Sequence, residues 1–234
     1  MNASNPVVLI TGAAGHLGRA VAGAFAAAGA TVALLDRDAG ALLRAFGPES
    51  DMRMHLAVNL LDDADTRAAV DAAAQRFGRI DVLCNLAGGF RMGDPVHATA
   101  AATWDFLFGL NVRTLQHACA AAVPHMLAQG RGKIVNVGAF SAQRGAAQMG
   151  AYIASKSAVI RLTESMAAEL REHGINVNCV LPTIIDTPDN RSGMPDADPA
   201  RWVAPADLAN VIMFLASSAA RAVHGAALPV TGLS

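Results

Sequence analysis

Tyr152 and Lys156 stand four residues apart in the segment Tyr-Ile-Ala-Ser-Lys, a spacing that can activate a phenol. Two residues four apart on a helix lie on the same face, with Cβ atoms about 5–6 Å apart. An unperturbed tyrosine titrates near pH ~10, and bringing that pKa toward neutrality takes roughly 4 kcal/mol from nearby positive charge. The spacing therefore predicts that Lys156 lowers the pKa of Tyr152 and that Tyr152 acts as an acid.

A short apolar strand near the N-terminus runs into three glycines, Gly12, Gly15 and Gly18. Glycines let the backbone approach a pyrophosphate, and a helix that starts there offers free N–H groups and partial positive charge. The spacing alone is weak evidence, because the chain holds 21 glycines. Asp36, however, ends the second predicted strand, where a ribose-binding acid is expected. Together these features predict a dinucleotide site.

Asp36 also bears on the choice of dinucleotide. Its carboxylate is expected to accept hydrogen bonds from the adenosine ribose and to repel a 2′-phosphate, which favours NAD over NADP. Arg37 follows directly and weakens this preference. It is either a phosphate contact or a solvated turn residue.

Short strand patterns alternate with Ala-rich helical patterns along the chain. Strict alternation predicts an α/β fold, a doubly wound parallel sheet of the Rossmann type whose strand ends carry the motifs. No linker divides the chain, so we expect a single domain over residues 1–234. The predicted strands are 7–11, 31–36, 52–58, 80–86, 133–137, 176–181 and 227–230. The first predicted helix ends at residue 29, and the others span 39–46, 62–77, 99–129, 151–173 and 205–217.

Composition excludes several classes of partner. Hydrophobic residues make up 53% of the chain and charged residues 16%, which suits a large buried core. A net charge of −1 gives no excess of basic residues of the kind that binds nucleic acid or an anionic membrane. The N-terminus lacks the basic and apolar regions of a signal sequence, and no apolar run reaches membrane-spanning length.

Cysteines and histidines show no metal-binding or disulfide pattern. The three cysteines, Cys84, Cys119 and Cys179, are far apart in apolar runs, which favours free buried thiols and a cytoplasmic protein. The seven histidines are dispersed, so we predict no metal site.

Several motifs occur in a fixed order: Thr11-Gly12, Asn85-Leu86-Ala87-Gly88, Asn111, Tyr152 and Lys156. In this order they resemble the short-chain dehydrogenase/reductase family over essentially the whole chain. The resemblance implies an oxidoreductase that uses NAD(P)H to pass hydride to a small carbonyl, imine or quinonoid acceptor. It also implies a homodimer or homotetramer.

The resemblance assigns roles to individual residues. Tyr152 would supply the proton, Lys156 would bind the nicotinamide ribose, and Asn111 would hold a water in a relay to Lys156. Asn59 and Leu60 would flank the adenine. With the glycine turn and Asp36, the predicted cofactor-binding set is Thr11, Gly12, Gly15, His16, Leu17, Gly18, Asp36, Arg37, Asn59, Leu60, Asn85, Ala87, Gly88, Tyr152, Lys156, Pro182, Ile185 and Thr187.

The chain departs from the family pattern at three positions. His16 stands where a glycine is usual, so Gly15 takes the middle role, and Thr183 replaces another glycine. Ala139 occupies the place of the catalytic serine. Losing such an oxyanion donor costs about 2.7–4 kcal/mol. Ser141 is the nearest hydroxyl, and it is either recruited or an ordinary loop serine.

One branch of the family, the quinonoid dihydropteridine reductases, is similar in having alanine at the serine position. The segment from Asp186 to Asp198 also resembles the loop of that branch. A quinonoid acceptor spreads its arriving charge, so it needs fewer oxyanion donors. Two alternatives stay open: a 3-oxoacyl or simple ketone reductase that uses Ser141, and a non-catalytic dinucleotide-sensing protein.

Substrate contacts are expected around a loop at residues 183–204. Phe90 follows a predicted strand end and is the preferred stacking residue. The full set of substrate candidates is Phe90, Ala139, Ser141, Met194 and Trp202.

Overall fold

The computed structural model describes residues 5–234, which form one seven-stranded parallel sheet in the order β3-β2-β1-β4-β5-β6-β7. Residues 1–4, the start of the predicted domain, lie outside the described residues. The strands are β1 (Val7–Thr11), β2 (Thr31–Asp36), β3 (Arg53–Ala57), β4 (Val82–Asn85), β5 (Gly132–Val137), β6 (Ile175–Pro182) and β7 (Ala227–Val230).

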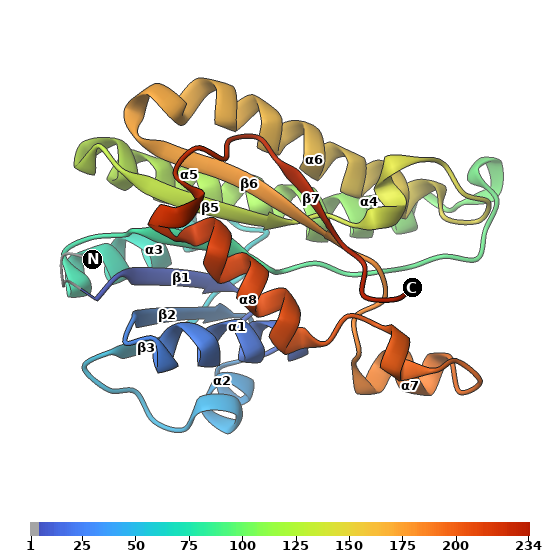
Figure 1. Ribbon diagram of the computed structural model, residues 1–234, viewed down its shortest axis with the longest axis horizontal. Helices are drawn as coiled ribbons and strands as arrows, with labels where there is room; N and C mark the ends of the chain where they lie inside the picture. The colour runs from blue at the N-terminus through green and yellow to red at the C-terminus, as the bar shows by residue number, and fades with distance from the viewer. Residues whose placement is uncertain (1–4) are drawn as a thin grey trace.

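Helices cover both faces of this sheet (Figure 1). One buried cluster joins α1 and α8 to the sheet, and a second joins α3, α5 and α6 to the opposite face. The helices are α1 (His16–Ala27), α2 (Ala39–Phe46), α3 (Asp63–Phe77), α4 (Ala101–Phe108), α5 (Thr114–Gln129), α6 (Gly150–Leu170), α7 (Pro188–Gly193) and α8 (Pro205–Ala216). This arrangement confirms the predicted doubly wound fold.

The strand order reverses at β1: β2 and β3 extend the sheet on one side of β1, and β4 to β7 extend it on the other. Every residue of β1 is buried, as expected for a strand covered on both faces. Thr11, the last residue of β1, is in register with Leu35 of β2 and Asn85 of β4. In open parallel sheets, ligands bind beside the carboxyl ends of the strands at such a reversal. The predicted dinucleotide motifs therefore meet at one edge.

Two predicted elements are shorter or broken. The strand predicted over 80–86 covers only β4, because the backbone of Ile80 pairs with the Gln129 side chain and the N–H of Leu86 donates to Thr11 Oγ1. The helix predicted over 99–129 is divided by a π-helical turn, Gly109–Arg113, which contains Asn111. Turns of this kind often mark functional sites.

The remaining predicted elements agree with the structure to within a few residues at each end. The predicted elements do not include α7, a short helix inside the predicted substrate loop. Within residues 5–234, none of the helices is long and apolar enough to cross a membrane. The described part of the chain also holds no group of three His, Cys, Asp or Glu side chains placed to bind a metal ion.

Candidate active site

The glycine turn between β1 and α1 is shaped by the absence of side chains. Gly12 has φ +64°, and a Cβ on it would lie 3.0 Å from backbone atoms of Ala87. A Cβ on Gly18 would lie 2.3 Å from the Gly12 carbonyl oxygen. Gly15 caps α1 without a side-chain bond, so no side chain competes for the first N–H groups of the helix. The turn therefore fits the pyrophosphate of a dinucleotide.

Thr11 ties the glycine turn to the end of β4. Its hydroxyl oxygen accepts hydrogen bonds from the N–H groups of Leu86 (3.0 Å) and Ala87 (3.2 Å). Thr11 is itself buried, so this link is shielded from water. The predicted cofactor-binding segments after β1 and β4 are thus held together.

Asp36 lies at the end of β2 with its carboxylate against the same turn. One oxygen accepts from the Ala14 N–H at 2.9 Å, and the other accepts from the Arg37 N–H at 2.8 Å. Each oxygen keeps further lone pairs for a ribose hydroxyl. Arg37 is exposed. His16 and Leu17, in the first turn of α1, are half-buried.

Tyr152 and Lys156 lie in the first two turns of α6; Lys156 is buried and Tyr152 is half-buried. Burial lowers the pKa of Lys156 to about 8 and raises the pKa of Tyr152 to about 12. The Lys156 ammonium donates to the Val137 carbonyl at 2.8 Å. In the protein without a cofactor, the Tyr152 pKa moves opposite to the lowering that was predicted from Lys156 together with an oxidised nicotinamide ring. Desolvation is the cause, because burial disfavours the charged phenolate.

Asn111 lies in the π-helical turn, and its side chain bonds in three directions. Oδ1 accepts from the Gly89 N–H at 2.8 Å, while Nδ2 donates to the Gly89 carbonyl at 3.1 Å and to Ser155 Oγ at 3.0 Å. A Cβ on Gly88 would lie 3.0 Å from Asn111 Oδ1 and 3.2 Å from Lys156 Nζ. The amide and the ammonium thus converge beside Gly88, and a side chain at this position would press on both.

Other predicted cofactor residues have mixed surroundings. Asn85 is buried, and its Nδ2 donates to Asn136 Oδ1 at 2.9 Å, while its own Oδ1 has no partner. Asn59 is exposed, and its side chain accepts from the Leu61 N–H. Leu60 is buried in the core beside α3 and α5. Asn59 and Leu60 therefore turn in opposite directions.

Phe90 lies directly against Tyr152. Their rings meet edge to face, with centroids 4.8 Å apart, and Phe90 remains 54% exposed. Ala139 is buried just beyond the end of β5. Ser141 follows in a 3₁₀ turn, Phe140–Gln143, and is half-buried.

The predicted loop at residues 183–204 is closed at its base. Ile185 forms a parallel bridge with Val203, and beyond it Thr187 caps α7 by accepting from the Asn190 N–H at 3.2 Å. Pro182 is buried at the end of β6. Trp202 is buried at the base of the loop, whereas Met194 is half-buried where α7 ends.

The Thr183 side chain, which stands where the family has a glycine, makes contacts that a glycine could not make. Its hydroxyl bonds to the Thr231 carbonyl at 2.9 Å and lies 2.7 Å from Ser234 Oγ. Arg201, near the other end of the loop, donates to the Leu233 carbonyl. The C-terminal residues therefore hold both ends of the loop.

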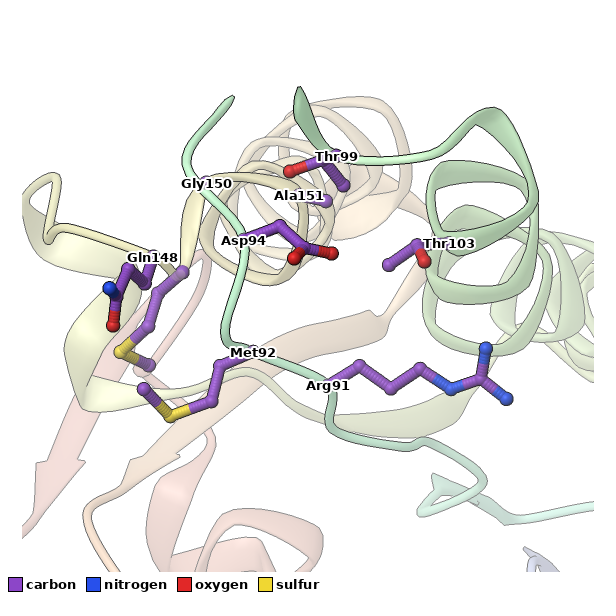
Figure 2. Close-up of a pocket in the computed structure, with 9 residues that line it drawn as sticks. Arg91, Met92, Asp94, Thr99, Thr103, Gln148, Gly150 and Ala151 are labelled. Carbon is purple, nitrogen blue, oxygen red and sulfur yellow. The ribbon is translucent and has the colours of Figure 1, made fainter. Parts of the chain in front are cut away.

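A cavity of about 160 Å³ opens beside the first turn of α6. Figure 2 shows Asp94 and Thr103 pointing toward one another across it, with Arg91 below them. The Arg91 guanidinium stacks 3.6 Å from the centre of the Phe106 ring. Gln148, also in the wall, is the one non-glycine residue with positive φ (63°) between residues 5 and 234. Such backbone strain is common beside functional sites.

Comparison with known proteins identifies the family. The sequence model of the short chain dehydrogenase family matches residues 6–197, which is most of the chain. The chain belongs to the short-chain dehydrogenase/reductase family. It is 34% identical to 2-(R)-hydroxypropyl-CoM dehydrogenase of Xanthobacter autotrophicus, with 97% of each chain covered.

Solved structures of this short-chain dehydrogenase/reductase family superpose closely on the chain. A 3-ketoacyl-(acyl-carrier-protein) reductase from Brucella melitensis complexed with NADH has a TM-score of 0.87 at 32% identity, covering 97% of each chain. A gluconate 5-dehydrogenase from Burkholderia cenocepacia, in complex with NADP and tartrate, has a TM-score of 0.89 at 31% identity, covering 98% of this chain and 95% of the other. The predicted class, an oxidoreductase using a nicotinamide dinucleotide, is confirmed.

Sequence reasoning missed Ser155, although it lies within the quoted Tyr-Ile-Ala-Ser-Lys segment. It also missed the cavity residues Arg91, Asp94 and Gln148. A positive φ at Gln148 leaves no pattern in the sequence. The contact of Ser155 joins it to Asn111, 44 positions away, so the spacing within the segment does not indicate it.

Proposed function

We propose that the protein is an NADH-dependent reductase of a small molecule, with Tyr152 as the proton donor. The observation that supports this most is the convergence of Asn111 Oδ1 and Lys156 Nζ beside Gly88. Gly88 follows directly on the segment that Thr11 ties to the glycine turn. The acid–base groups therefore lie beside the segment that follows β4, next to the glycine turn.

Each residue has a defined task in this proposal. A bound NADH supplies a hydride. The high pKa of Tyr152, about 12, keeps its phenol protonated at neutral pH, ready for transfer to the acceptor. Lys156 is held by Val137 where its charge can favour the phenolate that remains. Asn111 orients the water that returns the proton through Lys156.

Asp36 supports NAD over NADP as the cofactor. Its carboxylate is fixed against the glycine turn by two backbone N–H groups. A ribose hydroxyl can donate to the remaining lone pairs, whereas a 2′-phosphate beside this carboxylate meets like-charge repulsion. The outward position of Arg37 leaves Asp36 as the group nearer the turn.

Ala139 supports an acceptor whose arriving charge is delocalised, such as a quinonoid dihydropterin or a quinone. The site offers a buried methyl group where the family has a serine hydroxyl. A localised ketone oxyanion would lose a donor worth about 2.7–4 kcal/mol there. Phe90, partly exposed against Tyr152, provides an aromatic edge for a flat ring, and Met194 and Trp202 belong to the loop that would cover it.

The family resemblance also supports a homodimer or homotetramer in the cytoplasm. The three free cysteines are buried, as suits a reducing compartment. Light scattering on the purified protein gives its mass in solution, and a monomer would contradict the proposed assembly.

Tyr152→Phe tests the proposed function, because it removes only the hydroxyl. Turnover with NADH should fall by about 10²–10⁴. The NADH dissociation constant, measured by fluorescence titration, should stay near that of the wild-type protein. Unchanged turnover across pH would remove Tyr152 as the acid.

A further inference from the structure

Ser155 is a completely buried serine between the two reactive residues of α6. Its hydroxyl donates to the Tyr152 carbonyl at 2.7 Å and lies 3.0 Å from Asn111 Nδ2. A serine hydroxyl carries one hydrogen, and that hydrogen is engaged with Tyr152. Toward Asn111 it therefore acts as an acceptor. One hydroxyl links the first turn of α6 to the π-helical turn.

The hydrogen-bond pattern fixes which way the Asn111 amide faces. A backbone N–H can only donate, so the group that faces the Gly89 N–H must be Oδ1. Nδ2 is then left to the Gly89 carbonyl and Ser155 Oγ, which use both of its hydrogens. Without the Ser155 oxygen, one buried N–H of Asn111 loses its partner, and the present orientation loses one of its three bonds.

This orientation sets what Lys156 faces. Asn111 Oδ1 and Lys156 Nζ both lie close to the same point beside Gly88. An amide oxygen near an ammonium stabilises the charged form, whereas an amide N–H there would destabilise it. Lys156 is buried. It donates to the Val137 carbonyl, and the Cys179 thiol is the titratable group whose charge would favour the ammonium.

We propose that Ser155 is a positioning residue that holds the Asn111 amide oxygen toward Lys156 and so maintains the proton supply to Tyr152. The inference rests on the proposed function. Ser155 itself touches neither the acceptor nor the reacting atoms in this account. Its effect passes through Asn111.

A double-mutant cycle tests this coupling, with Ser155→Ala, Asn111→Ala and both together. The assay follows NADH oxidation with phenanthrenequinone as acceptor. Ser155→Ala should lower kcat about tenfold and leave the NADH dissociation constant within about threefold, since no cofactor contact is removed. In the Asn111→Ala background the same change should cost at most about twofold, because the path is already broken. Tenfold losses in both backgrounds would overturn the proposal.

The pH profile gives a readout that a purely structural role would not move. Ser155→Ala leaves one Asn111 N–H without its partner and the amide less firmly held, so the amide oxygen favours the Lys156 ammonium less and the pKa of Lys156 should fall below its value of about 8. The alkaline limb of the kcat profile should therefore shift to lower pH in Ser155→Ala. An unshifted limb would contradict the assignment.

Ser157→Ala is the matched control, since Ser157 lies on the same helix and also donates to a carbonyl, that of Ala142. It should keep kcat within about twofold, because it has no contact with Asn111. If Ser155→Ala does not fold, Ser155→Cys keeps the volume with a weaker acceptor. Full kcat with an unshifted profile in that variant would overturn the proposal.

Unfolding of the cofactor-free protein in urea provides a test independent of activity. Ser155→Ala should destabilise the wild-type background more than the Asn111→Ala background, and equal losses would contradict the link. If the wild-type protein does not oxidise NADH with any acceptor, the proposed function fails. An active wild type with additive losses refutes only the role of Ser155.

Discussion

The two sides of the active site are built by different means. On the dinucleotide side, the turn after β1 is shaped by backbone atoms, and Gly12 and Gly18 leave no room for a Cβ. On the proposed acceptor side, the candidate wall residues Phe90, Ala139 and Met194 lie on irregular segments. Backbone geometry tolerates almost no change, whereas side chains can be exchanged. The acceptor side is therefore where we expect substitutions such as Ala139 to alter the reaction.

Gly18→Ala should break the dinucleotide side most severely. The new Cβ would lie 2.3 Å from the Gly12 carbonyl oxygen, so the turn must move. We expect a loss of about 1–3 kcal/mol in the free energy of unfolding. NADH affinity should fall about a hundredfold or more, since the pyrophosphate contacts depend on the same turn.

Gly23→Ala is the matched control in the same helix. A Cβ on Gly23 meets nothing within 4 Å. This variant should gain about 0.5–1 kcal/mol of stability from helix propensity and bind NADH normally. Equal behaviour of the two variants in urea unfolding and NADH titration would show that the turn is not held as described.

Lys156→Met tests the residue that joins the two sides. Turnover should be lost and NADH affinity should fall about tenfold, because the ribose contact and the charge disappear together. Burial of Lys156 should also give the wild-type protein a pH-dependent contribution to its free energy of unfolding, which the variant lacks. The folded pKa of Lys156, about 8, lies below its ordinary value of 10.5, so between these values the unfolded chain binds more protons.

Stability rises with pH when the unfolded state binds more protons. From pH 8 to pH 9, the free energy of unfolding of the wild type should therefore increase by about 1 kcal/mol relative to Lys156→Met. Urea titrations at the two pH values measure this difference. A constant or falling difference would contradict the burial of a titrating lysine.

Asp36→Ala should change cofactor choice without affecting the acceptor side. Removing the carboxylate ends like-charge repulsion with a 2′-phosphate and leaves Arg37 beside it. The ratio of kcat/KM for NADH to that for NADPH should fall about tenfold or more. A wild-type protein that prefers NADPH would reverse this part of the account.

Ala139→Ser should have the smallest effect on the native reaction. A hydroxyl at this buried position adds a donor beside the site and helps a localised oxyanion most. We expect native turnover to change by roughly a few fold and reduction of simple ketones to rise. If Ser141→Ala instead abolishes turnover while NADH binding is kept, Ser141 replaces the missing serine and the acceptor is a localised carbonyl.

The sequence predicted the dinucleotide side well, because regular strands and glycine positions leave strong periodic and compositional patterns. It placed β1 and β2 correctly, together with Asp36 at the end of β2. It did not predict the π-helical turn around Asn111, whose side chain bonds to Gly89 and Ser155, far away in the sequence. Nor did it predict the pKa direction of Tyr152, because burial depends on the assembled loops.

Stopped-flow oxidation of bound NADH tests the central claim most directly. The acceptors are a quinonoid dihydropterin, a quinone, an imine and a simple ketone, each mixed with wild type and with Tyr152→Phe. The account predicts rapid NADH oxidation by the delocalised acceptors, slower oxidation by the ketone, and a loss of about 10²–10⁴ in Tyr152→Phe. NADH binding without oxidation by any acceptor would contradict it and indicate a dinucleotide-sensing protein.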